Sequence, residues 1–81
     1  MYLDDVKQIL TDVLSLGAAG AQLHADSPLL GALPELDSMA VVNLITALEE
    51  HFGISVDDDE ISADTFATLG SLAAFVGHKL A

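Results

Sequence analysis

The pair Asp37-Ser38 is the part of the sequence whose residue types and position are best suited to covalent chemistry. It lies where a connection rich in proline and glycine is followed by the apolar-periodic run "SMAVVNLITALEEHF". A side chain at the start of a helix meets backbone N–H groups that have no partner within the helix, so Ser38 can act as a simple N-cap. Its hydroxyl can also be a site of covalent modification. The pair alone leaves both interpretations open.

Catalysis by Ser38 itself is not supported by its neighbours. A nucleophilic serine needs a base within hydrogen-bond reach and a donor for the oxyanion. Ser38 is preceded by the acidic Asp37, and no histidine is placed to activate it. The chain has no cysteine that would serve instead. The sequence therefore predicts no catalytic residues and no enzymatic activity.

The acidic run "VDDDEISADTF" is the natural candidate for a cation site. In a calcium loop that begins at Asp57, Asp59 would stand at the third position, as required. Ile61, Ser62 and Thr68 would then stand where an oxygen ligand, a glycine and a glutamate are needed. The three histidines form no closely spaced pair suited to zinc, and thiolates are absent. The sequence therefore predicts no metal site.

Charge and composition limit the classes of partner. Thirteen acids stand against two lysines, which gives a formal net charge of −11. Nucleic acids and anionic membrane surfaces are therefore unsuitable partners, whereas proteins with basic patches are attracted. With 52% hydrophobic residues, we expect residues 1–81 to form one folded domain, monomeric and stabilised by packing. No segment is apolar over the length of a membrane span and no basic signal region precedes one, so we expect a cytoplasmic protein.

The elements that position Ser38 are predicted to be helices. Apolar residues with a 3.6-residue period predict helices over residues 3–16 and 38–52 and after a cap at Thr68. Gly17 and Gly20 are expected to end the first helix, and Gly53 is expected to end the second. A short helical turn is expected within residues 59–64. The fold class is therefore all-α, a bundle of three main helices plus one short helix. The residues predicted to face inward from the three main helices are Leu3, Val6, Ile9, Leu10, Val13 and Leu14, then Val41, Leu44, Ile45, Leu48 and Phe52, then Leu69, Leu72, Ala73, Val76 and Leu80.

Residues 17–37 form a long connection between the first and second main helices. Its prolines and glycines predict a loop, and a loop of this length in a small domain is usually functional. Asp26 or Ser27 is expected to cap a single turn that begins at Pro28. Three leucines in the loop are too apolar for full solvation and are expected to lie on the core, namely Leu29, Leu30 and Leu33.

Taken in order, these features resemble the acyl carrier protein family over essentially the whole chain. The likeness includes the acidic first helix, the long loop, "LDSM", "ALEEHFGI" and "DTFATLGSLAAFV". The resemblance implies that Ser38 carries 4′-phosphopantetheine, transferred from coenzyme A by a phosphopantetheinyl transferase. It implies that acyl intermediates are held as thioesters on this arm, in fatty-acid, polyketide or specialised acyl transfer. The helix start suits the phosphodiester, because its N–H groups and dipole favour an anion.

The sequence departs from the family pattern, and two departures point to a specialised carrier, namely the neutral residues Ala40 and Asn43 and the lead-in "LPELDS", which replaces a shorter segment that contains glycine. Met39 replaces the usual leucine, which is a volume-conserving change. Ala40 and Asn43 stand where carriers of fatty-acid synthesis often have acids. The resemblance implies that acyl-loading and acyl-accepting enzymes with basic patches dock on this helix. The residues that we expect to form the docking face are Asp37, Met39, Glu49 and Glu50.

The cargo and two alternative functions stay open at this stage. An acyl chain would enter between the second and last main helices, beside Ile45, Leu48, Ile61 and Phe66. An aminoacyl or peptidyl carrier is one alternative, although the net charge of −11 favours acyl cargo. The other is a small acidic interaction domain without a cofactor, in which Ser38 is only a cap.

Overall fold

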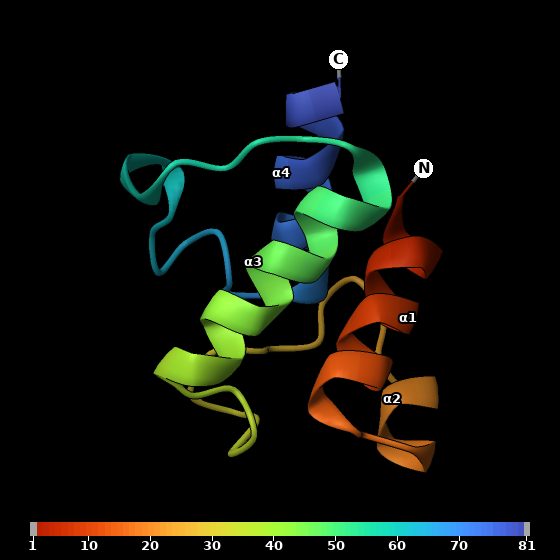
Figure 1. The fold of residues 1–81 in the computed structure, drawn as a ribbon. Helices are drawn as coiled ribbons and strands as arrows, with labels where there is room; N and C mark the ends of the chain where they lie inside the picture. The colour runs from red at the N-terminus through yellow and green to blue at the C-terminus, as the bar shows by residue number, and fades with distance from the viewer. Residues whose placement is uncertain (1, 81) are drawn as a thin grey trace.

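The computed structural model describes residues 2–80 and confirms the all-α architecture (Figure 1). The chain runs from α1 beside α2, through the long connection, into α3, and returns to α4, which lies behind α3 in Figure 1. α1 packs against both α3 and α4. Within residues 2–80 there is no β-strand, and no helix is long and apolar enough to cross a membrane. The elements are α1 (Leu3–Leu14), α2 (Ala18–Ala21), α3 (Ser38–Phe52), the 3-10 helix η1 (Asp58–Glu60) and α4 (Leu69–Leu80).

α1 is shorter than predicted, and a second helix follows it. α1 ends at Leu14 because Ser15 adopts a left-handed conformation with a φ of 54°, and its N–H bonds to the Thr11 carbonyl. The predicted end at residue 16 is therefore wrong. The short helix α2 then forms in the segment predicted to be loop, and its Gly20 is buried against the Thr11 side chain. A glycine here permits close contact of α2 with α1 and does not break the helix.

α3 has the predicted bounds, Ser38 to Phe52. It ends at Gly53, which has a φ of 68° that favours glycine and whose N–H bonds to the Glu49 carbonyl. Leu44 and Leu48 are buried. The other three residues of the predicted inward face are half-buried and pack against the core, namely Val41, Ile45 and Phe52.

α4 begins at the predicted cap. The Ser71 N–H bonds to Thr68 Oγ1, and the Thr68 N–H bonds to Ser71 Oγ, each at 3.0 Å. This reciprocal pair is a variant of the capping box. Leu80 is 37% exposed, so its predicted inward position is wrong. It lies in the last turn of α4. Four residues of the predicted inward face are buried, namely Leu69, Leu72, Ala73 and Val76.

The long connection is held against the start of α4 by backbone hydrogen bonds between residues 25–30 and residues 66–70, a contact that we call the seam. Pro28 and Thr68 form an isolated antiparallel bridge there. The bonds run from Leu29 N to Ala67 O, from Leu30 N to Phe66 O, from Leu69 N to Ser27 O and from Gly70 N to Ala25 O, at 2.8–3.0 Å. The loop before α3 is therefore fixed to the element that follows α3.

Pairing at the seam also explains two differences between the predicted and the observed structure of the long connection. Pro28 is used in the bridge with Thr68, so the predicted turn does not begin there. A turn forms instead where the Leu33 N–H bonds to the Leu29 carbonyl. Leu29 is fully buried and Leu33 is half-buried, as expected, but Leu30 is 45% exposed. Its backbone pairs with Phe66 while its side chain reaches solvent.

The short helix predicted within residues 59–64 is the 3-10 helix η1, which begins at residue 58. Glu60 is the last residue of η1, and its ion pair with Lys79 links η1 to α4. Both carboxylate oxygens of Glu60 accept bonds of 2.8 Å from Lys79 Nζ, and one also accepts from the Asp57 N–H at 3.0 Å. The connection between α3 and α4 is thereby anchored at the far end of α4.

Candidate functional site

Ser38 is the first residue of α3, and its side chain is exposed. The N-cap is the preceding residue, Asp37, whose carboxylate accepts a bond of 2.8 Å from the Ala40 N–H. The cap interpretation of Ser38 is therefore wrong, because the neighbouring acid performs that role. The Ser38 hydroxyl is left available at the surface.

The surroundings of Ser38 suit an attached phosphate ester. The N–H groups of Ser38 and Met39 lie in the first helical turn and have no partner within the helix. With the helix dipole, they favour an anion at this end. The segment that leads into α3 is fixed, because Leu36 is buried and its N–H bonds to the Leu33 carbonyl. An exposed hydroxyl on a fixed helix start thus fits the phosphodiester of 4′-phosphopantetheine.

Other serines are less suited to this role. Ser27 is buried, and its Oγ accepts a bond from the His24 N–H. Ser71 is committed to the cap of α4. Ser15 lies at the carboxyl end of α1, where the helix dipole disfavours a phosphate. Ser38 combines exposure with the favourable end of a helix.

Apolar side chains next to Ser38 are unusually exposed. Met39 is 70% exposed and Val42 is 59% exposed. Because residues three apart lie on the same side of a helix, they form one apolar surface beside Ser38. Asp37 is also exposed at this end. Val42 was not predicted as part of this surface, although its spacing of three residues from Met39 was a visible signal.

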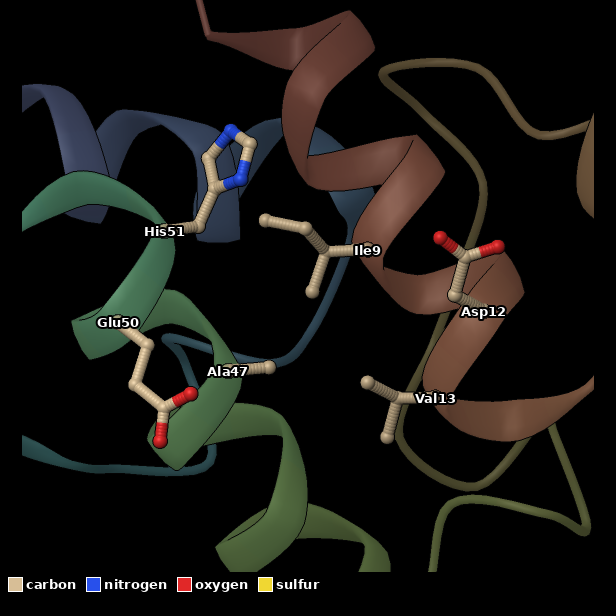
Figure 2. Close-up of a pocket in the computed structure, with 6 residues that line it drawn as sticks. All are labelled: Ile9, Asp12, Val13, Ala47, Glu50 and His51. Atoms are coloured by element: carbon tan, nitrogen blue, oxygen red, sulfur yellow. The ribbon is translucent and has the colours of Figure 1, made fainter.

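The structure separates the other two predicted docking residues from Ser38. Glu49 and Glu50 lie at the far end of α3, about 17 Å along the helix axis from Ser38. Glu49 is half-buried, and its Oε2 accepts a bond of 2.9 Å from the Val56 N–H. Glu50 is exposed and lies beside α1, across from Asp12 (Figure 2). Asp37 and Met39 therefore adjoin Ser38, whereas Glu49 and Glu50 do not.

The four residues expected beside an acyl chain belong to the core. Leu48 and Phe66 are buried, and Ile45 and Ile61 pack against the same cluster. Two hollows lie elsewhere, one between α1 and α3 and the other between the start of α1 and α4.

In the acidic run after α3, the Glu60 carboxylate is bonded to other groups of the chain. Hydrogen bonds from the Asp57 N–H and then from the Lys79 ammonium lower the pKa of Glu60 from its ordinary value. Among the side chains that the structure describes, those of residues 2–57 and 59–80, there is no cluster of three or more that could hold a metal ion.

Comparisons with known proteins agree with this geometry. The family model described as "Phosphopantetheine attachment site" matches residues 4–76. The chain is 36% identical to the acyl carrier protein of Helicobacter acinonychis (strain Sheeba) over 80 residues, which cover 96% of this chain and 95% of that protein. It is 37% identical to that of Sinorhizobium fredii over 75 residues, which cover 88% and 85% of the two chains.

A solved structure is also similar. The solution NMR structure of a holo acyl carrier protein from Nitrosomonas europaea is 68% identical in sequence, with a TM-score of 0.92. The match covers 99% of this chain and 96% of that one. The predicted family, fold and cofactor are thereby confirmed. The chain belongs to the acyl carrier protein family, whose members are non-enzymatic carriers with a phosphopantetheine attachment site.

Proposed function

We propose that Ser38 is the residue of this carrier to which 4′-phosphopantetheine is attached. The observation that supports this most strongly is its exposed hydroxyl on the first residue of α3, beside a cap supplied by Asp37. In the loading reaction, Ser38 Oγ attacks the phosphorus of coenzyme A that bears the pantetheine. The diphosphate P–O bond breaks, adenosine bisphosphate leaves and the hydroxyl proton passes to a base of the transferase. The chain has no cysteine, so the thiol that bears an acyl group belongs to the arm.

The partners in this proposal are a phosphopantetheinyl transferase and the enzymes that load and accept the acyl group. Asp37 and Met39 form the docking face beside Ser38, and the exposed Val42 extends it. Basic patches on these enzymes are attracted by the net charge of −11. Glu49 contributes mainly to the fold in this proposal, because its carboxylate holds the Val56 N–H.

We propose acyl groups as the cargo, in fatty-acid, polyketide or specialised acyl transfer. The strong negative charge favours acyl over aminoacyl cargo. A single domain over residues 1–81, a monomeric state and a cytoplasmic location stay predictions.

Intact-mass spectrometry tests the attachment site. The purified protein is incubated with coenzyme A and a broad-specificity phosphopantetheinyl transferase, beside Ser38→Ala and Ser55→Ala. Ser55 is the matched control, because it is an exposed serine outside any helix. We expect the parent and Ser55→Ala to gain one phosphopantetheine and Ser38→Ala to gain none. A folded parent protein that gains nothing, or a Ser38→Ala protein that is loaded, would refute the proposal.

A further inference from the structure

A hollow of about 320 Å³ lies between α1 and α3, away from Ser38. Figure 2 shows Ile9 and Val13 of α1 facing Ala47 of α3, so the floor is apolar. The carboxylates of Asp12 and Glu50 stand on opposite sides of this floor, one from each helix. The remaining lining residue is His51, whose ring packs edge-on against Phe52 with centroids 4.7 Å apart. We call this site the α1–α3 hollow.

The two carboxylates of the α1–α3 hollow are not neutralised by the lysines of the chain. Lys79 is bound to Glu60, and this is the one ion pair among the side chains that the structure describes, those of residues 2–57 and 59–80. Lys7 precedes Ile9 by two residues, which places it on nearly the opposite side of α1. Asp12 accepts a bond from the neutral Gln8 side chain at 3.0 Å. The hollow therefore combines an apolar floor with two uncompensated negative groups.

We propose that the α1–α3 hollow receives the side chain of a lysine or arginine from a partner protein. Such a side chain has an aliphatic stem that packs on apolar surface and a cationic head that stays near water. The stem matches the floor of Ile9, Val13 and Ala47, and the head lies between Asp12 and Glu50. An acyl tail has no cation to pair with either carboxylate, so it suits this open site less well.

This inference deepens the proposed function, on which it rests, by assigning a second contact surface for the basic partners of the carrier. Ala47 lies on the side of α3 that faces α1, whereas Glu50 follows Met39 by about three helical turns and lies on nearly the same exposed side of α3 as Met39. A partner that uses both surfaces would contact α3 from its first turn to its last. Its basic residue would then fix the orientation in which the partner approaches Ser38, since charge pairs set register at interfaces.

A titration with small cations tests the α1–α3 hollow directly. The ¹H–¹⁵N NMR spectrum of the full chain, loaded at Ser38, is followed while n-butylguanidinium chloride is added. Guanidinium chloride supplies the head without the stem, and n-butanol supplies the stem without the charge. We expect saturable shifts from n-butylguanidinium at the amides of the hollow and weaker, non-saturating shifts from the other two compounds. Shifts that are spread evenly over the exposed acids, or an equal response to n-butanol, would overturn the proposal.

Matched variants separate the α1–α3 hollow from general electrostatics. Asp12→Asn and Glu50→Gln each remove one carboxylate with little change of shape, and both side chains are exposed, so folding is retained. We expect each to raise the Kd for n-butylguanidinium by about two- to fivefold. Asp26→Asn changes the charge equally at an exposed loop position outside the hollow, and its Kd should match the parent. Equal weakening in all three variants would overturn the proposal.

The two proposals fail in different ways. Loading of Ser38 is read from the intact mass, and occupancy of the α1–α3 hollow is read from amide shifts on loaded or unloaded protein. A protein that is loaded but shows no shifts at the hollow overturns the second contact surface alone. A protein that shows these shifts but is not loaded overturns the assignment of Ser38 alone.

Discussion

The Asp37 carboxylate accepts a bond of 2.8 Å from the Ala40 N–H, so the acid beside Ser38 is the N-cap of α3. The same residue is proposed to meet basic partners. Structure and docking therefore depend on one side chain, and its two roles are separable because asparagine caps a helix without carrying a charge.

Removal of the cap is expected to destabilise the fold. Asp37→Ala should lower the free energy of unfolding by about 1 kcal/mol, because the Ala40 N–H loses its partner. Asp37→Asn should retain most of this free energy. Urea unfolding followed by circular dichroism measures both. An Asp37→Ala protein as stable as the parent would contradict the assigned cap.

Removal of the charge alone is expected to weaken docking. Asp37→Asn should raise the KM of the transferase for this carrier by about two- to fivefold, with little change in kcat. The difference from the parent should shrink as salt is added, since exposed charges are screened. Steady-state loading rates at two salt concentrations provide the check. A KM that does not change would exclude Asp37 from the transferase interface.

Ser38→Ala is expected to fold as well as the parent. The Ser38 side chain is exposed and Asp37 caps the helix, so the free energy of unfolding should change by less than about 0.5 kcal/mol. This is measured by the same urea titration. A loss of more than about 1 kcal/mol would show that the hydroxyl also supports the helix start.

Gly70 and Gly77 offer a matched pair within α4. A Cβ at Gly70 would lie 2.8 Å from the Ala25 carbonyl oxygen, which is backbone of the seam, whereas one at Gly77 would lie 3.4 Å from the Tyr2 ring. Gly70→Ala should therefore destabilise the fold by about 1–3 kcal/mol. Gly77→Ala should be neutral or stabilising by up to about 1 kcal/mol, because alanine favours a helix. Thermal and urea unfolding of both variants test this, and equal stabilities would contradict the close approach at Gly70.

The lowered pKa of Glu60 predicts a dependence of stability on pH. The pKa of Glu60 is lower in the folded state than its ordinary value, so the ionised Glu60 carboxylate stabilises the fold. This stabilisation is fully present at pH values above the ordinary pKa and is lost as the pH falls through the pKa of the folded state. Glu60→Gln should therefore lose less stability than the parent between about pH 7 and about pH 3.

Glu35→Gln is the control for Glu60, since Glu35 is exposed and forms no ion pair with any side chain that the structure describes. Melting temperatures across this pH range supply the measurement. Identical profiles for the parent and Glu60→Gln would contradict the shift.

Local signals made much of this fold predictable. The bounds of α3 follow from a capping acid and a terminal glycine, and the start of α4 follows from Thr68. Local signals also point to Ser38, although Ser38 and not Asp37 was the residue considered as a cap.

The errors have non-local causes. Gly20 was interpreted as a helix breaker, but it is in a helix because its missing side chain makes room for Thr11. The bond from the Val56 N–H to the Glu49 carboxylate was not predicted, because the two groups meet only after the chain turns at Gly53. The exposure of Leu30 depends on pairing with Phe66, far along the chain. No local pattern contains these contacts.

The seam joins segments that are distant in the sequence, and it therefore links their opening motions. An amide proton exchanges with solvent only when its hydrogen bond opens, and neighbouring bonds that open together form one cooperative unit. The N–H groups of Leu29 and Leu30 come from one side of the seam, and those of Leu69 and Gly70 come from the other. A fluctuation that releases the loop ahead of Ser38 must also release the start of α4, so deuterium uptake in the two segments should rise and fall together.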